Sequence, residues 1–422
     1  MTNDPLANRG KPENRTLIIL ILGALSAVGP FSIDMYLPGF PAMALDLDVS
    51  VDVVSYSLAS FFAGICIGQL LCGPLLDRFG RKRPLIAGMS LYILASIGCA
   101  LSDSIEMLIV FRFFQALGGC VGMVAPRAII RDVFPVAENA RIFSLMILIL
   151  GVAPICAPTA GSFLIAQFGW HSIFITLTVI GVLVLLAVIF KLPESKQPDP
   201  LYSLKARPIL SNFYTVLKVP QFYIYSLMGA ISSAGLFAYL AGSPFVFMKL
   251  YKVTEQQYGF IFAIIAAGLI LCSQLNNQLL KKYTSEQITW VTLSVQTLVG
   301  MLLLVGTIFD FLHLYGTIAL IAMFLSCQGF AFPNSSALSM APFTKNAGSA
   351  SALMGAMQMA FGALAAAIIG LSNPTSAIPL ALIMAACAGT ALLILLLGTF
   401  NVKYRSRKAD AEEAAIEMVE KY

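Results

Sequence analysis

Charged side chains are scarce in this sequence. Only 11% of its 422 residues are Asp, Glu, Lys or Arg, and 59% are hydrophobic, whereas charged residues make up about 25% of an ordinary soluble domain. A soluble fold could not cover so much apolar surface, so the composition predicts an integral membrane protein. The apolar runs are long and unbroken rather than alternating, which excludes a membrane β-barrel and indicates long helices.

Residues that carry out catalysis or bind metals are also few. The chain has two histidines, His171 and His313, and its eight cysteines fall within apolar runs and form no CxxC pair. No zinc-protease, nucleophile-elbow or phosphate-loop motif is present. We therefore expect neither an enzyme nor a metal or cofactor site. The net charge of +5 comes from cations in short loops and does not indicate nucleic-acid binding.

Twelve apolar segments are long enough to cross a bilayer as helices, at about 20 residues or more each. The predicted spans are residues 16–38, 52–76, 84–102, 105–127, 141–166, 172–191, 221–248, 256–280, 287–309, 314–340, 347–371 and 376–400. We therefore expect an all-α membrane protein with twelve transmembrane helices.

The positions of Lys and Arg predict the orientation and the division of the chain. With the N-terminus inside, 23 of the 26 cations lie in inner segments, as the positive-inside rule requires if both ends are cytoplasmic. The longest polar stretch divides the spans six and six. The predicted parts are an N-tail (1–15), a bundle (16–191), a linker (192–220), a second bundle (221–400) and a C-tail (401–422), in which residues 409–422 could form a short surface helix.

The two halves show signs of an internal repeat. Matched residues are separated by 203 to 205 positions, close to half of the chain length. The matched pairs are Gly39 and Gly242, Pro41 and Pro244, Gly64 and Gly268, Gln69 and Gln274, Arg78 and Lys282, and Gly151 and Gly355. Small residues are common in membrane spans, so chance is the competing explanation. A duplication would predict two parallel bundles with a site between them, which is a transporter architecture.

Two charged residues, Asp34 and Arg112, lie within the apolar interior of predicted spans. Burying either group costs at least about 2.5–3.5 kcal/mol on insertion scales, so each should face a partner or a watery cavity. Their depths in the outer half of the bilayer agree within about one helical turn, which makes a shared cavity possible. There Asp34 could exchange a proton, because an apolar cavity opposes ionisation of a carboxyl group and a nearby cation favours it. The competing interpretations are a wetted Asp34 at the outer interface and an Arg112 that only holds helices together.

Other side chains could line a cavity, although helix packing explains each of them at least as well. They are the polar residues Gln115, Gln274, Asn276, Gln328, Asn334 and Gln358, and the aromatic residues Tyr36, Phe61, Phe237 and Tyr239. In the fifth span, Pro154 and Pro158 remove backbone donors and predict a bend. Gly151 and Gly161 in the same span provide a small face for close helix contact.

The most charged short segment is Gly73–Pro84, with the sequence GPLLDRFGRKRP. Its cations hold the connection between the second and third spans on the cytoplasmic side. Its glycines permit a tight turn and close helix approach, and Asp77 is placed to pair with Arg81.

This loop resembles the signature of the major facilitator superfamily. The matching positions are Gly73, Asp77, Arg78, Gly80, Arg81 and Lys82. FRFFQALGG from Phe111 is similar to the superfamily's fourth-span motif, with Arg112 and Gln115 at the expected spacing. The fifth-span stretch resembles the motif of drug:proton antiporters, except that Ala157 and Ser162 replace glycines.

Three further segments are similar to the bicyclomycin-resistance (Bcr/CflA) branch of that superfamily. They are SIDMYLPGFP from Ser32, the pair Arg131-Asp132, and FGWHSIF from Phe168. The resemblance implies the major facilitator fold of two six-helix bundles in the bacterial inner membrane. It also implies export of small amphipathic compounds or drugs, driven by inward proton flow through alternating access.

By the same resemblance, Asp34 would be the proton-titrating or substrate-facing acid, and we group Arg112, Tyr36 and Gln115 with it. The Gly73–Arg83 loop would latch the inner helix ends in the outward-facing state. We expect a monomer whose partners are its small-molecule substrate, protons and the lipid bilayer. Two alternatives are a transporter of a native metabolite, in either direction, and a membrane sensor or scaffold that transports nothing.

Overall fold

The computed structural model describes residues 15–134, 136–199, 204–343, 347–372 and 376–398. The expected tails lie outside these ranges apart from Arg15, as does the surface helix expected at residues 409–422. The described residues contain twelve helices long and apolar enough to cross a membrane. The expectation of an all-α protein with twelve spans is therefore confirmed.

The helices follow the order of the predicted spans. The first six spans are α1 (Arg15–Asp34) continued by η1 (Leu37–Gly39) and α2 (Phe40–Asp46), α3 (Val51–Phe79), α4 (Lys82–Ala100), α5 (Ile105–Val133), α6 (Val136–Phe168) and α7 (His171–Lys191). The last six are α9 (Pro220–Pro244) continued by the π-helical η2 (Phe245–Leu250), α10 (Glu255–Leu279), α11 (Ser285–Ile308), α12 (Leu314–Met340), α13 (Ala347–Leu371) and a final helix, Ile378–Gly398. A short helix, α8 (Ala206–Leu217), lies between the two sets.

Several helix ends differ from the predicted spans. The first α-helix ends at Asp34 rather than at residue 38, because Pro38 cannot donate a helical hydrogen bond and disfavours helical geometry at the residue before it. Conversely, α5 continues to Val133, six residues past the predicted end at residue 127. No glycine or proline interrupts residues 127–133, so the helix carries its charged residues beyond the apolar stretch.

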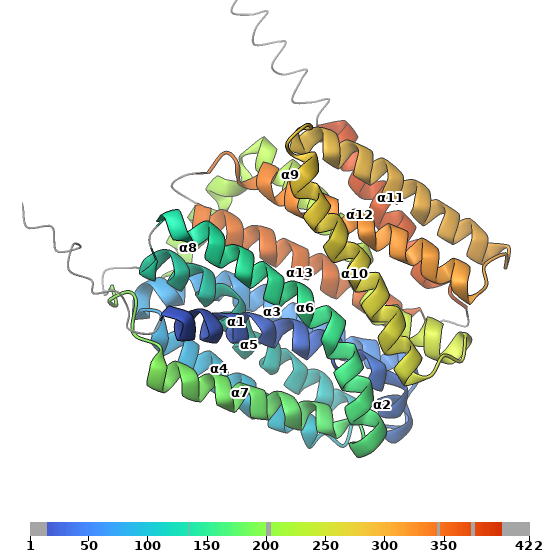
Figure 1. Ribbon diagram of the computed structural model, residues 1–422, viewed down its shortest axis with the longest axis horizontal. Helices are drawn as coiled ribbons and strands as arrows, with labels where there is room; N and C mark the ends of the chain where they lie inside the picture. The colour runs from blue at the N-terminus through green and yellow to red at the C-terminus, as the bar shows by residue number, and fades with distance from the viewer. Residues whose placement is uncertain (1–14, 135, 200–203, 344–346, 373–375, 399–422) are drawn as a thin grey trace, which may run out of the picture.

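Contacts group the spans into two sets of six. In the first set, α1 contacts α5, α6 and α7, and both α3 and α4 contact α5. In the second set, α12 contacts α9, α10 and α11, and the final helix packs on α9 and α11. Figure 1 shows the blue-to-green helices on one side of the molecule and the yellow-to-red helices on the other.

The most extensive contacts between the sets are those of α3 with α13 and of α6 with α10. The matched glycines of the two halves lie at both contacts. A Cβ atom on Gly151 would lie 3.5 Å from Ile270 of α10, and one on Gly355 would overlap the side chain of Gln69 of α3. Equivalent packing of residues 204 positions apart supports the duplication that the sequence indicated.

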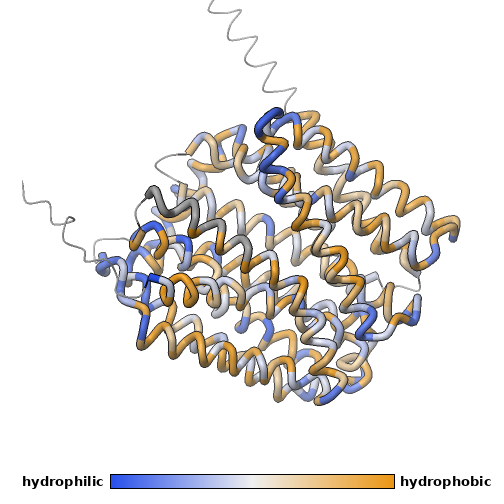
Figure 2. The backbone as a smooth tube through the Cα atoms, in the orientation of Figure 1, coloured by the Kyte–Doolittle hydropathy of each residue, from blue (hydrophilic) through white to orange (hydrophobic). Residues whose placement is uncertain are grey.

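The two ends of the molecule differ. We call the end that carries the Gly73–Pro84 loop the basic end. At the other end, η1 contacts α9 and α10, and α2 contacts η2, so the two sets touch there. Hydrophobic positions follow the lengths of the helices, while hydrophilic positions gather toward helix ends and connections (Figure 2). The arrangement fits a bilayer around the helix middles and leaves the sets apart only toward the basic end.

Candidate functional site

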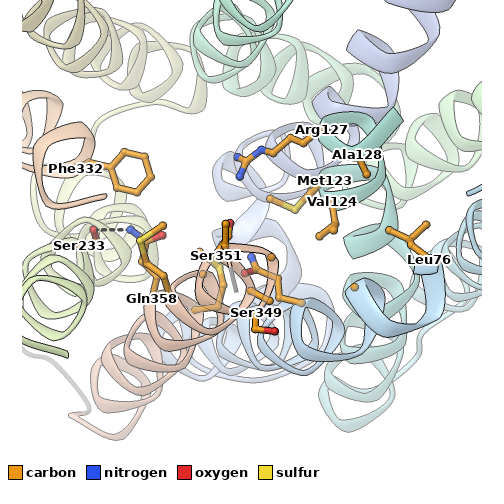
Figure 3. A pocket seen from close by; sticks show the side chains of 18 of the residues that line it. Leu76, Met123, Val124, Arg127, Ala128, Ser233, Phe332, Ser349, Ser351 and Gln358 are labelled. Carbon is orange, nitrogen blue, oxygen red and sulfur yellow. Dashed lines mark hydrogen bonds between the residues drawn. The ribbon is translucent and has the colours of Figure 1, made fainter. Parts of the chain in front are cut away.

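A cavity of about 850 Å³ lies between the two sets of helices, in the half of the molecule nearer the basic end. One wall comes from α3 and α5, the facing wall from α9, α10, α12 and α13, and α8 contributes at the mouth. In Figure 3, Leu76, Met123 and Arg127 lie on one side of it and Ser233, Phe332 and Gln358 on the other. Because the sets touch at the opposite end, the structure is open to the basic end only.

The cavity combines adaptable apolar surface with a few polar groups. Met123, Met354, Met359, Phe237 and Phe332 form part of its lining. Methionine side chains are flexible and polarizable, and they adapt to ligands of irregular shape. A volume of several hundred Å³ with this lining is typical of sites for small molecules.

A chain of buried amides and hydroxyls supports the wall formed by the second set. Gln358 Nε2 and Gln328 Nε2 donate to Ser233 Oγ over 3.1 and 2.6 Å. Behind them, Ser232 Oγ lies 2.8 and 2.9 Å from the side-chain oxygens of Gln328 and Gln296, which share its one hydroxyl hydrogen. The network holds Ser233 in a fixed position at the cavity surface.

Arg112 is 0% exposed and lies among the helices of the first set, outside the cavity lining. Its Nη1 donates to the backbone oxygen of Ser32 over 3.0 Å and to Gln115 Oε1 over 2.7 Å. Gln115 Nε2 donates in turn to Ser96 Oγ over 2.8 Å. Because α1 ends at Asp34, the oxygen of Ser32 is one of the last-turn carbonyls left without a helical partner, and Arg112 supplies one.

Aromatic rings enclose the same guanidinium group. Its central carbon is 4.3 Å from the ring centre of Tyr36 and 4.0 Å from that of Phe61. Tyr36 is held by a 2.6 Å hydrogen bond between its hydroxyl and Ser57 Oγ. A cation over aromatic faces is stabilised electrostatically, most strongly where water is excluded. The structure therefore brings Arg112, Tyr36 and Gln115 together, as the sequence analysis grouped them.

No carboxylate neutralises Arg112 in the described part of the chain. Its Nε and Nη2 atoms are buried and have no hydrogen-bond partner there. A buried charge of this kind is costly.

Asp34 ends α1 and is 5% exposed. Within the described ranges its carboxyl group forms no hydrogen bond and no salt bridge, so it is not bonded to Arg112. The η1 segment that follows it contacts α9 and α10 of the second set. Asp34 therefore lies at the closed interface between the sets, away from the residues that line the cavity.

The Gly73–Pro84 loop is bound within the first set and to the segment after α7. Arg81, which is buried, donates from Nε to Asp132 over 2.8 Å and from Nη1 to Asp77 over 3.1 Å. Asp77 also accepts from Lys196 over 2.8 Å. Arg78 Nη1 donates to the backbone oxygen of Asp199 over 3.3 Å.

Glu194 completes the fixation of this loop. Its carboxylate accepts the backbone N–H groups of Arg81 and Lys82 over 2.7 and 3.0 Å. The turn has Gly80 at φ +81°, where a Cβ atom would be 2.8 Å from the backbone oxygen of Lys196. Glycine is therefore required at this position by both conformation and space, whereas a Cβ atom on Gly73 would meet nothing within 4 Å.

The residues of the fifth-span motif lie on α6, where the two sets meet. Pro154 and Pro158 are inside the helix. Gly161 touches the backbone of Met35, directly after Asp34, so closely that a Cβ atom would overlap its carbonyl oxygen. Ser162, which replaces a glycine of the family motif, donates to the backbone oxygen of Pro158 over 2.7 Å and faces Gly259 of α10.

Sequence reasoning located some of the cavity residues and missed others. Phe237, Gln328 and Gln358 line the cavity, and each was among the candidates. Arg127 was not among the candidates, because it stood at the predicted end of the fourth span. The uninterrupted helical stretch that follows it was the available signal that α5 continues. Ser233 carried no signal, because one serine in a span full of small residues does not reveal which way it faces.

Among the described residues, no group of three or more His, Cys, Asp or Glu side chains could hold a metal ion.

Comparisons with known proteins agree with this architecture. The model of the family described as Major Facilitator Superfamily matches residues 19–367. The chain is 33% identical to the Bacillus subtilis "Uncharacterized MFS-type transporter YdgK", over 88% of this chain and 92% of the relative. It is 30% identical to a "Bicyclomycin resistance protein homolog" of Haemophilus influenzae, over 89% of this chain and 94% of the relative.

A solved structure has the same fold. The crystal structure of a D-xylose-proton symporter matches with a TM-score of 0.71 and 15% identity, covering 90% of this chain and 97% of the other. The family match spans most of the chain, and the relatives align along nearly their whole length. The chain therefore belongs to the Major Facilitator Superfamily of secondary transporters, where it resembles the bicyclomycin-resistance branch.

Proposed function

We propose that this protein exports small amphipathic compounds across the bacterial cytoplasmic membrane in exchange for protons. The observation that carries the proposal is the cavity, which separates the two sets at one end while Asp34 lies buried at the closed other end. With the basic end cytoplasmic, as its cations favour, the cavity faces the cytoplasm. The similarity to a bicyclomycin-resistance homologue favours export of a drug-like compound.

Asp34 is proposed to carry the proton. A charged carboxylate buried without a partner is costly, whereas a neutral carboxyl group is far less so. A protonated Asp34 is therefore compatible with the closed interface around it. When this interface opens to the outside, water would reach Asp34, and proton uptake there would accompany substrate release.

Arg112 is proposed to stabilise the ionised state of Asp34 in the return step. Both residues belong to the first set, and the backbone oxygen of Ser32, two residues before Asp34, is already bonded to Arg112. A small change at the end of α1 would bring the carboxylate toward the free Nε and Nη2 groups of Arg112. This would lower the energy of the charged form after the proton leaves.

The two bundles, residues 16–191 and 221–400, are proposed to rock about the α3–α13 and α6–α10 contacts, connected by the linker 192–220. In the inward-open arrangement the Gly73–Pro84 loop binds Glu194 and Asp132, both on its own side of the cavity. Closing the cavity would carry the second bundle toward this loop, where the loop can act as a latch for the outward-facing state.

The test is substrate-induced proton release from purified protein in weakly buffered detergent solution. Bicyclomycin is added first, followed by a panel of amphipathic drugs, to wild type and Asp34→Asn. The control is Asp48→Asn, which makes the same chemical change at an exposed position. We expect release from wild type and the control, and none from Asp34→Asn.

Equal release by wild type and Asp34→Asn would exclude Asp34 as the coupling site. If no drug produces release and a metabolite panel does, the transporter serves a native metabolite. A protein that shows neither release nor flux in sealed vesicles would be the non-transporting sensor or scaffold.

A further inference from the structure

The charged side chains of the cavity wall are unbalanced. The cavity is lined by four charged residues of the described chain, Asp77, Arg81, Arg127 and Arg131. Asp77 is bonded to both Arg81 and Lys196, and Arg81 is also bonded to Asp132. These charges therefore satisfy one another at the mouth of the cavity.

Arg127 and Arg131 have no such partners. No hydrogen bond or salt bridge joins either guanidinium group to another residue in the structure as described. The two residues are one turn apart on α5, and Arg127 lies deeper in the cavity. Figure 3 shows the Arg127 side chain reaching across toward Ser233 and Gln358. A cationic compound entering from the basic end would meet these two cations and, among the described residues of the lining, no unbonded carboxylate.

The facing wall presents a second hydrogen-bond donor. Ser233 is 2% exposed and lines the cavity. Its oxygen accepts from Gln328 and Gln358, and its hydroxyl hydrogen has no acceptor among the described residues. A serine hydroxyl carries one donor in addition to its acceptor sites. Ser233 can therefore donate into the cavity from α9, while Arg127 donates from α5.

We infer that the cavity binds an amphipathic anion, whose carboxylate or other acidic group accepts from Arg127 and Ser233. The apolar body of the ligand then lies against the methionines and Phe332. Charge-assisted hydrogen bonds from guanidinium to carboxylate are the strong class, and they gain strength where little water is present. The inference rests on the proposed function only in taking this cavity as the substrate site.

Such a ligand would bond to both bundles at once. Arg127 belongs to the first bundle and Ser233 to the second. An anion between them would neutralise the free cation and satisfy the free hydroxyl in the same contact. Drawing the two walls together is the movement that closes the cavity, so ligand charge would favour the step that carries the substrate across.

Three matched probes test this inference by equilibrium binding in detergent. 1-Naphthoate, 1-naphthamide and 1-naphthylmethylammonium share one ring system and are anionic, neutral and cationic. Isothermal titration with wild type should give naphthoate a Kd at least about tenfold below those of the other two, as expected for one charge-assisted bond. Titration of empty micelles corrects for partitioning into detergent.

Variants assign the preference to residues. Arg127→Gln should abolish the preference for naphthoate, and Arg127→Lys should retain part of it as a point charge without the planar fork. Ser233→Ala should weaken naphthoate binding severalfold. This variant tests the inference independently if Arg127→Gln does not fold. Arg207→Gln, the same change on an exposed residue of α8 that does not line the cavity, should behave as wild type.

A preference for the cation, equal affinities, or no binding of any probe would overturn the inference. So would an unchanged naphthoate preference in folded Arg127→Gln. The proposed function fails separately, since Asp34→Asn should retain the naphthoate preference whether or not Asp34 carries the proton.

Discussion

Replacing Arg112 with methionine should remove proton-coupled transport while leaving the stability of the fold nearly unchanged. The two side chains have similar length and bulk, and methionine can pack against Tyr36 and Phe61. Arg112 is fully buried and has no carboxylate partner in the described structure. The substitution therefore removes one favourable and one unfavourable contribution to the free energy of folding, and the two are of similar size.

The favourable contribution comes from two hydrogen bonds and two cation–π contacts. Hydrogen bonds to a charged group contribute about 1.5–3 kcal/mol each, and desolvated cation–π contacts contribute about 2 kcal/mol each. Two terms oppose folding. Burying one ion costs on the order of several kcal/mol, and leaving two N–H groups unsatisfied costs about 1–3 kcal/mol each. The net change should be within about 2 kcal/mol.

Arg81→Met is the matched comparison, because Arg81 is also buried but bonds to two carboxylates. Removing it leaves Asp77 and Asp132 without their shared cation. Breaking a buried pair costs about 3–5 kcal/mol, and the partial exposure of both acids lowers the expected cost to about 2–3 kcal/mol. Arg81→Met should therefore melt well below wild type, and Arg112→Met should not.

The measurement is thermal denaturation in detergent with a thiol-reactive dye. Every variant carries Cys156→Ser, because Cys156 is exposed and would react in the folded protein. Cys72, Cys99 and Cys120 are free and buried, so the dye then reports loss of helix packing. Such melts are irreversible and compare variants by order only. An Arg112→Met protein that melts below Arg81→Met would refute the reasoning, as would one that melts like wild type and still releases protons on substrate addition.

Two glycine pairs give further predictions, each measured by the same melt. Gly161→Ala should lower the free energy of unfolding by about 1–3 kcal/mol, because the added methyl group overpacks against the carbonyl of Met35. Gly151→Ala meets only ordinary contact distances and should be tolerated. Equal melting temperatures of the two variants would contradict the close packing of α6 on the end of α1. Gly80→Ala should destabilise the protein by about 1 kcal/mol or more, because φ is +81° and a backbone oxygen would lie 2.8 Å from the new Cβ atom. Gly348→Ala, whose Cβ atom would have nothing within 4 Å, should leave the stability unchanged. A Gly80→Ala protein as stable as Gly348→Ala would show that the turn tolerates a side chain.

The number and order of the spans could be predicted because segment length and apolar content alone decide whether a helix crosses a bilayer. The exact ends could not. Pro38 stops α1 four residues early, and α5 carries Arg127 past the apolar stretch as helix. The first charged residues after an apolar segment show where the membrane core ends. The helix itself continues until a proline, a glycine or a capping residue ends it.

The candidate site was partly predictable for a similar reason. Arg112 stood out because a charge inside an apolar run is rare, and its grouping with Gln115 follows from positions three apart on one helix face. Which side chains face the cavity depends on how two bundles meet, and the rotation of each helix is set by its neighbours. Ser233 and Arg127 come together only through contacts between residues more than 100 positions apart, which periodicity along one chain does not contain.

The unbonded arginines of the cavity also have an electrical consequence. If a monoanion leaves the cell as one proton enters, each cycle moves the equivalent of two positive charges inward. A membrane potential of 100 mV, negative inside, adds about 2.3 kcal/mol per charge, or roughly 4.6 kcal/mol for such a cycle, against half of that for a neutral substrate. A cell whose pH gradient has collapsed would then still expel an anion on voltage alone, with twice the electrical driving force available for an uncharged compound.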